Sequence, residues 1–214
     1  MKRDAKGRFV KATKKIKIEF QSWAGRAAIE IEAENVREAV EKAVADGENL
    51  NGALLNGASL NGASLNWASL NWASLDGASL NGASLNWASL DGASLNGASL
   101  DGASLNWASL DGASLDGASL NGKPLWKLRP VLQLGPCGSV GRTTVVFFFE
   151  DGSEPLIRCG CFTGTIAEFR AKIYDTHAGT FHESEYNALS DHIDEMYAIQ
   201  QEELKAQKEN EGNK

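Results

Sequence analysis

The stretch ASLNWASLNWASLDG at residues 63–77 writes one five-residue unit three times, and the unit continues far beyond it in both directions. Leucine stands at every fifth position from Leu50 to Leu125, and alanine at every fifth position from Ala53 to Ala118. Residues five apart form no apolar stripe on an α-helix, and in a strand they point to opposite faces because five is an odd number. The repeat therefore predicts neither a helix nor a regular strand.

A square coil with one unit on each side accounts for the repeat. Every leucine then points toward the central axis, and the Asn-Gly or Asp-Gly pairs lie where the chain turns. Four sides make a lap of twenty residues, so residues twenty apart become neighbours in successive coils at about 4.8 Å, the usual spacing of hydrogen-bonded strands. We expect the structural core to include Leu60, Leu65, Leu80, Leu85, Leu100 and Leu105.

The tryptophans support the twenty-residue lap. Trp67, Trp87 and Trp107 are each twenty residues apart, so we expect them on one corner of successive coils, with Trp72 on the adjacent corner. Such a ridge would be a large apolar patch, which monomers seldom expose, and tryptophan is enriched at binding hot spots. A partner protein, a second copy of this chain or the chain's own C-terminal helices could cover the ridge, and simple exposure to solvent is the remaining alternative.

The repeated unit resembles that of the pentapeptide-repeat family. The sequence ASLNG at residues 58–62 has the family's small residue, leucine and glycine, but places serine before the leucine and Asn or Asp after it. The resemblance covers Leu50 to Leu125 and implies a mainly β fold, a right-handed quadrilateral β-helix of about four coils. Because the ends of a solenoid core are apolar, we also expect a cap at each end.

The segment before the repeat predicts an N-terminal cap. Apolar and polar residues alternate over 16–21 and 29–32, which is typical of two strands of a hairpin. A helix is predicted from Val36 to Val44, with Asn35 as its N-cap and Gly47 as its stop.

The segment after the repeat predicts a small α+β domain. Strands are expected over 131–134, 143–150 and 155–162, followed by a helix that begins with a capping box of Thr165 and Glu168. A second helix is expected from about Ser184, and the charged residues after Gln200 are expected to fray. We divide the chain into a basic disordered arm (1–14), a hairpin and helix cap (15–48), the β-helix (49–126), the α+β domain (127–200) and a charged tail (201–214).

The sequence GPCGS at 135–139, with GCFTG at 160–164 and Glu168-Phe169, is similar to a segment that follows pentapeptide repeats in bacteriophage proteins. This resemblance implies an accessory protein of phage type, which would act in the host cytoplasm. It assigns no function to the C-terminal domain.

Two patterns of chemical interest have simpler interpretations. The sequence PCGSVGRT at 136–143 only partly matches a phosphate-binding loop and precedes a predicted strand, so we interpret it as a connection. Cys159, Cys161, His177 and His182 could hold zinc, but structural zinc sites space their cysteines by two to four residues. We favour buried, reduced thiols on one face of a sheet.

No catalytic motif is present in the sequence. The serines of the repeat have no histidine among them to activate a nucleophile. The sequence therefore predicts a protein that is not an enzyme, with no catalytic residues, no cofactor and no metal.

Five aspartates are expected on the outside of the coils, at Asp76, Asp91, Asp101, Asp111 and Asp116. Some pentapeptide-repeat relatives mimic duplex DNA with carboxylate-lined rods and block gyrase, which suggests inhibition of a host DNA-acting enzyme such as gyrase or a defence nuclease. The simpler interpretation is that Asp and Asn are interchangeable turn formers. The competing function is a scaffold or homo-oligomer built on the tryptophan ridge.

The composition restricts the partners. The 214 residues carry 21 Lys and Arg against 28 Asp and Glu, a net charge of −7, which argues against a general DNA or membrane-surface binder. Only the basic arm, up to Lys17, could contact nucleic acid. The chain has no long apolar run, no apolar signal core and an odd number of cysteines, which predicts a cytoplasmic protein with a host or phage protein as its partner.

Overall fold

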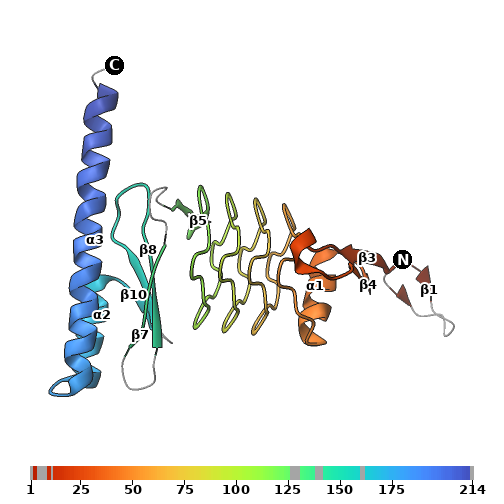
Figure 1. Ribbon diagram of the computed structural model, residues 1–214, viewed down its shortest axis with the longest axis horizontal. Coiled ribbons are helices and arrows are strands. Elements are labelled where there is room, and N and C mark those ends of the chain that lie inside the picture. The colour runs from red at the N-terminus through yellow and green to blue at the C-terminus, as the bar shows by residue number, and fades with distance from the viewer. Residues whose placement is uncertain are drawn as a thin grey trace. The chain divides into compact units, whose positions relative to one another are not determined.

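The computed structural model describes residues 2–3, 9–10, 12–125, 131–137, 142–159 and 162–212. The chain divides into two compact units, Met1–Gly122 and Lys123–Lys214 (Figure 1). This division falls slightly before the boundary expected at residue 126.

Most of the first unit is a coiled segment, residues 50–122, in which residues twenty apart lie side by side (Figure 1). Parallel bridges join residues twenty apart on each of the four sides of a lap, for example Ser59 to Ser79 and Ser64 to Ser84. Within one such pair of coils, Leu60 N donates to Ser79 O over 2.7 Å. The backbone hydrogen bonds therefore show the twenty-residue lap that the spacing of the tryptophans predicts.

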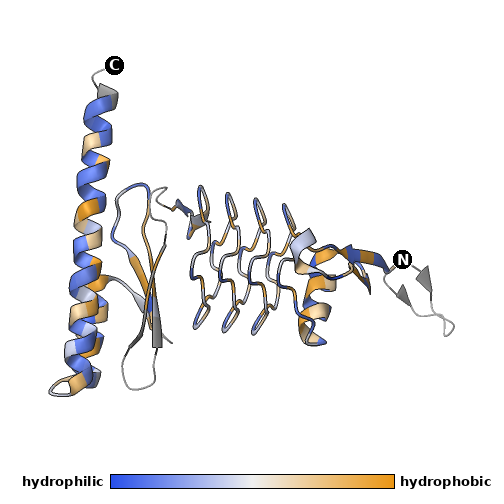
Figure 2. Ribbon diagram, in the orientation of Figure 1, coloured by the Kyte–Doolittle hydropathy of each residue, from blue (hydrophilic) through white to orange (hydrophobic). Residues whose placement is uncertain are grey.

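The repeated leucines form the core of the coiled segment. Leu60, Leu65, Leu80, Leu85, Leu100 and Leu105 are each at most 2% exposed. Most of the alanines are buried with them, except Ala58 and Ala113, and most of the serines are half-buried. Figure 2 shows apolar positions recurring at the same place in each coil, as expected when all leucines point inward.

Each unit of the repeat ends in a β-turn. In the turn after Leu60, Ala63 N donates to Leu60 O over 3.0 Å, and Gly62 has a φ of 65°. Positive φ at the third turn residue alone is the mark of a type II turn, which favours glycine there. The Asn-Gly and Asp-Gly pairs thus supply the corners of the coil.

A hairpin leads into the first coil. Strand β3 (Lys14–Ile18) pairs antiparallel with β4 (Ile29–Ala33), and a 3₁₀ turn (Ser22–Ala24) lies between them. The chain just after β3 is bonded to the coil, because Phe20 forms a bridge with Ala53. Before this hairpin, β1 (Lys2–Arg3) pairs with β2 (Phe9–Val10) in the segment for which a disordered arm was expected.

Helix α1 (Val36–Ala45) covers the start of the coiled segment. Its N-cap is Asn35, whose side chain accepts from Glu38 N, as predicted. Arg37 donates to Asn61 O over 3.1 Å, and Glu41 accepts from Ser64 N over 2.9 Å. The helix is therefore fixed to the first coil by polar contacts, and its buried Ala39 packs on Ile16 and Ala33 of the hairpin.

The second unit contains a four-stranded antiparallel sheet in the order β10-β9-β8-β7. Its strands are β7 (Val131–Cys137), β8 (Arg142–Phe147), β9 (Leu156–Cys159) and β10 (Phe162–Gly164), and two-residue strands β5 (Ser119–Leu120) and β6 (Lys123–Pro124) lie at the unit boundary. Strand β10 was not predicted as a separate element, because the expected third strand ran through residues 160–161, which lie outside the described residues.

Two helices, α2 (Ile166–His177) and α3 (Phe181–Gly212), pack on the sheet. The predicted capping box is confirmed, since Thr165 Oγ1 accepts from Glu168 N and Glu168 Oε2 accepts from Thr165 N. Helix α3 continues beyond Gln200 to Gly212, where a frayed tail was expected. Leu204 still packs on the core, and residues such as Glu, Lys, Ala and Gln favour a helix where no apolar face is buried. Among the described residues, no helix has the length and apolar character needed to cross a membrane.

Candidate functional site

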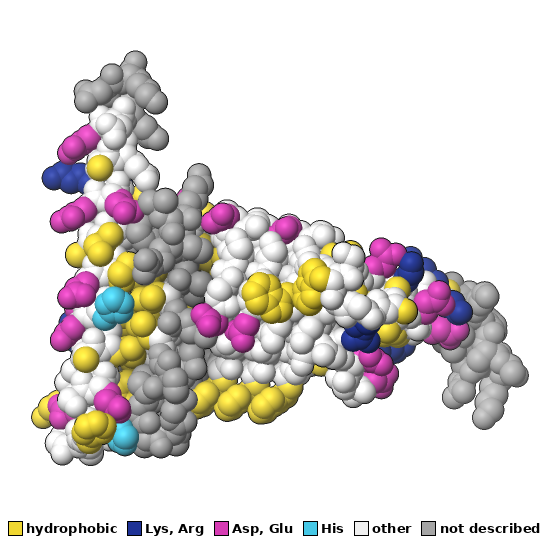
Figure 3. Space-filling model, viewed as in Figure 1, with side chains coloured by type: hydrophobic (Ala, Val, Ile, Leu, Met, Phe, Trp, Pro, Cys, Tyr) yellow, Lys and Arg dark blue, Asp and Glu magenta, His cyan; other side chains and the backbone are white. Residues whose placement is uncertain are grey.

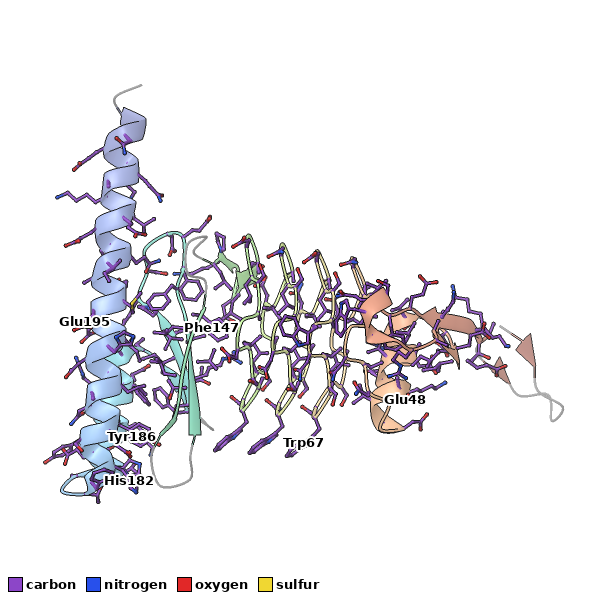
Figure 4. The ribbon with its side chains drawn as sticks, viewed as in Figure 1. Glu48, Trp67, Phe147, His182, Tyr186 and Glu195 are labelled. Atoms are coloured by element: carbon purple, nitrogen blue, oxygen red, sulfur yellow. The ribbon has the colours of Figure 1, made fainter. Side chains whose placement is uncertain are left out.

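Three tryptophans of the coiled segment stack in a column. The ring centroids of Trp67 and Trp87 are 4.8 Å apart with 3° between the planes, and those of Trp87 and Trp107 are 4.5 Å apart with 4°. Figure 4 shows Trp67 projecting from the edge of the coils, and Figure 3 shows hydrophobic side chains in a row there. The predicted stacking of residues twenty apart is confirmed, and we call these three residues the tryptophan column.

The tryptophan column is exposed to solvent over much of its surface. Trp67 is 68% exposed and Trp87 is 43% exposed, and Trp72 on the next corner is 59% exposed. Trp107, the third ring of the column, is half-buried. Two exposed indole rings on one edge, with a third on the adjacent corner, form a surface of the kind that marks a binding site.

The backbone at the tryptophans is unusual. Trp67, Trp87 and Trp107 have φ values of 64°, 63° and 63°, at the turn position that glycine occupies in most other units. This left-handed conformation brings Cβ close to the carbonyl oxygen and costs a non-glycine residue about 1–2 kcal/mol. Strain of this kind is characteristic of functional positions.

Stacking does not make the column a source of stability. A stacked aromatic pair contributes about 0.5–1.5 kcal/mol beyond its buried area, and the column contains two such pairs. Three strained residues at about 1–2 kcal/mol each cost as much or more. The fold itself therefore gains little from tryptophan at these positions.

The corner that bears the column carries no charged turn residue. Asn66, Asn86 and Asn106 precede the three tryptophans, whereas each of the other three corners has at least one aspartate. A partner would therefore meet apolar rings and neutral amides there, without having to desolvate a carboxylate.

Trp72 lies against the next coil on the adjacent corner. A Cβ placed on Gly92 would lie 2.5 Å from Trp72 Cε3, so the indole covers that glycine closely. Gln21 Nε2 donates to Trp72 O over 2.7 Å. The position of Trp72 is thus tied to the N-terminal cap and to the following coil.

Trp23 belongs to the same corner, although no sequence pattern indicated this position. Its ring lies against Gly52, with 3.2 Å from Trp23 Cη2 to a Cβ placed there, and its indole N–H donates to Gln21 Oε1 over 2.5 Å. Trp23 is 58% exposed. It stands outside the repeat, so no periodicity places it. The bridge between Phe20 and Ala53 and the hydrogen bond from Gln21 N to Gly52 O bring it onto the coil.

The five predicted aspartates do not converge on one surface. Asp91 and Asp111 lie on neighbouring coils of one corner, Asp76 and Asp116 lie two coils apart on another, and Asp101 lies on a third. The carboxylates are therefore spread over three corners.

The aspartates and asparagines form the same ladder between coils. Asn86 Oδ1 accepts from Ser104 Oγ over 2.6 Å and from Asn106 N over 3.0 Å. Asp76 Oδ1 accepts in the same way from Ser94 Oγ and from Asn96 N, over 2.5 and 3.0 Å. One oxygen of such an aspartate thus has a structural role that an amide oxygen can fill.

This ladder makes a prediction about Asn86. Asn86→Ala removes the acceptor for two donors and is expected to lower the free energy of unfolding by about 1–3 kcal/mol. Asn86→Asp keeps the acceptor and should cost less than half as much. Urea unfolding followed by circular dichroism measures both variants, and equal losses would show that the ladder does not stabilise the coil.

The residues considered for zinc are only partly described. Cys159 is buried on β9, Cys161 lies outside the described residues, and the rings of His177 and His182 have centroids 6.1 Å apart. Among the residues that the structure describes, no three His, Cys, Asp or Glu side chains are placed to hold a metal ion. In the sequence at 136–143 that partly matches a phosphate-binding loop, residues 138–141 also lie outside the described residues. Strand β8 begins at Arg142.

The coiled segment is the part of this chain that matches a known protein family. A family profile described as "Pentapeptide repeats" matches residues 43–77, 68–106 and 88–122, with 8 copies. No match was found among curated proteins.

Three solved structures of cyanobacterial pentapeptide repeat proteins are similar to this chain. HetL from Nostoc sp. strain PCC 7120, which is involved in heterocyst differentiation regulation, is 38% identical over 36% of this chain and 38% of its own, with a TM-score of 0.25. The protein alr5209 from Nostoc PCC 7120 is 33% identical over 40% of this chain and 79% of its own, with a TM-score of 0.22. Rfr23 from Cyanothece 51142 is 34% identical over 32% of this chain and 41% of its own, with a TM-score of 0.22. The chain thus spans less than half the length of HetL and of Rfr23.

Proposed function

We propose, since this chain belongs to the pentapeptide-repeat family, that it is a non-enzymatic protein-binding platform whose contact surface is the tryptophan column. The platform is a right-handed quadrilateral β-helix of about four coils, which holds side chains at a fixed spacing. A rigid surface binds with little loss of conformational entropy, because its side chains are already in place.

The observation that carries this proposal is tryptophan in left-handed backbone on three successive coils. Each of Trp67, Trp87 and Trp107 occupies a position where glycine would be free of strain, and Trp67 and Trp87 remain substantially exposed. Residues that strain the backbone and leave apolar surface in water are explained by a contact that covers them. Tryptophan is also the residue most enriched among binding hot spots.

The experiment replaces the column by the residue that the turn prefers. Trp67→Gly, Trp87→Gly and Trp107→Gly together restore the sequence of the other units, so the variant is expected to keep its melting temperature. Its retention of a protein partner from a lysate of the natural host should fall at least tenfold, because each hot-spot tryptophan is worth about 2 kcal/mol or more. Quantitative affinity purification measures both baits side by side.

The matched control changes charge and leaves the column intact. Asp91→Asn, Asp101→Asn, Asp111→Asn and Asp116→Asn remove four carboxylates from the coils, and this bait should retain the partner. Sedimentation velocity of the same variants tests the alternative function, a scaffold or homo-oligomer. If the column joins copies of this chain, the oligomer should dissociate in the glycine variant and persist in the asparagine variant. Partner retention that is unchanged by the three glycines would refute the role of the column.

Inhibition of gyrase or a defence nuclease by DNA mimicry, in a phage accessory protein, is a second candidate. Asp91 and Asp111 on neighbouring coils of one corner favour it. Coils about 4.8 Å apart offer at most one such carboxylate each per corner, whereas duplex DNA carries a charge every 1.7 Å or so. The four-asparagine variant tests this candidate too, since a DNA mimic would then stop competing with DNA for its enzyme.

A further inference from the structure

A pocket of about 360 Å³ opens within the second unit, beside α2 and the strands β9 and β10. Its innermost residues are Cys159, Phe169, Ile173 and Tyr186, all buried. This volume lies at the lower end of the range for small-molecule sites, about 300–1,000 Å³.

Aromatic rings form the walls of the pocket. Phe162 and Phe169 have centroids 5.3 Å apart, and Phe169 meets Tyr186 edge to face at 6.1 Å. The ring of His177 stacks on Tyr186 at 5.1 Å. Tyr186, labelled in Figure 4, thus lies against Phe169 and His177 of α2. Walls of this kind favour a flat ring, which can stack or meet them edge to face.

The rim of the pocket is polar and carries a positive charge. Lys172, Thr163, Thr176 and His177 line it, and no carboxylate does so among the described residues. Within that part of the chain Lys172 forms no ion pair, whereas Arg170 on the same helix binds Asp191 and Asp194 at 2.8 and 2.7 Å. The ammonium of Lys172 is thus available at the rim for an anionic ligand.

We infer that this pocket binds a small planar aromatic molecule with an acidic group. Its ring lies among Phe162, Phe169 and Tyr186, its anionic group pairs with Lys172, and the Thr163 hydroxyl at the rim donates to it. The site belongs to the second unit alone and does not depend on the proposed function of the tryptophan column.

The test uses two probes that share an aromatic skeleton. 8-Anilinonaphthalene-1-sulfonate carries an acidic group, and N-phenyl-1-naphthylamine lacks it. Fluorescence titrations are made with the full chain bearing the three tryptophan-to-glycine substitutions, so that the column cannot bind either probe. We expect saturable binding of the sulfonate at a single site, and a weaker affinity for the amine.

Two substitutions locate the site. Lys172→Gln should weaken the affinity for the sulfonate about threefold, as expected for an exposed charge pair, and leave the affinity for the amine unchanged. Lys205 lies outside the pocket, so Lys205→Gln should change neither affinity. Thr176→Trp should fill the pocket and reduce the affinity for both probes at least tenfold. If this variant has a lowered melting temperature, Thr163→Trp makes the same test from β10. Absence of saturable binding, retention of both probes with the pocket filled, or equal effects of Lys172→Gln on both probes would overturn the inference.

Discussion

Replacing Leu85 with alanine is expected to lower the free energy of unfolding by about 2–5 kcal/mol. Leu85 is 1% exposed and lies between the equivalent leucines of the neighbouring coils, Leu65 and Leu105. The backbone of its coil is bonded to the coils before and after it, for example from Leu65 N to Ser84 O over 2.7 Å and from Leu85 N to Ser104 O over 2.7 Å. The structure therefore cannot collapse into the cavity, and the full cost of the cavity remains.

The repeat supplies its own control for this prediction. Leu54 stands at the position that serine occupies in most units, and its side chain is 40% exposed. Leu54→Ala should change the free energy of unfolding by no more than about 0.5 kcal/mol. Urea denaturation of both variants makes the comparison, and similar losses at Leu54 and Leu85 would contradict an inward-pointing column of leucines.

The second large effect is expected at Gly92. Its φ is 65°, and a Cβ there would lie 2.5 Å from Trp72 Cε3. Gly92→Ala therefore adds a steric clash to the backbone strain, and the free energy of unfolding should fall by about 2–4 kcal/mol. Thermal and urea unfolding measure the loss.

Gly97 separates the two causes. Its φ is 66° and an added Cβ would meet no atom within 4 Å, so Gly97→Ala should cost only the strain of about 1–2 kcal/mol. In a Trp72→Gly background, Gly92→Ala should cost no more than this. Additive effects of the substitutions at Trp72 and Gly92 in such a double-mutant cycle would show that the two residues do not interact in solution.

The features that the sequence could predict are those with a local or strictly periodic cause. The lap follows from the spacing of Leu and Trp, because only one coil geometry makes residues five apart equivalent. The caps at Asn35 and Thr165 follow from side chains that bond to backbone three residues away. These interactions need no knowledge of the rest of the fold.

The features that were missed depend on contacts distant in sequence. Trp23 reaches the coil through the bridge between Phe20 and Ala53 and through the hydrogen bonds of Gln21, and no repeat marks it. The end of α3 at Gly212 reflects helix propensity without burial, which a search for an apolar stripe overlooks.

The candidate sites were foreseen to different degrees. Stacking in the tryptophan column could be predicted from the twenty-residue spacing of the tryptophans. The left-handed backbone at these residues could not, since the pattern shows only that tryptophan replaces glycine at positions such as Trp87. The pocket beside α2 is formed by residues from β9, β10, α2 and α3. No spacing in the sequence predicts that residues from these four elements lie together.

The near-identity of the units has a consequence for how this chain can change length. Deleting a stretch of twenty residues within the coiled segment would leave every later side chain on its original corner. Deleting only five would carry each later tryptophan and aspartate to a different corner and divide the column. Insertions and deletions that preserve the binding surface must therefore occur in multiples of four units, so duplication of whole laps is the route by which such a protein can grow.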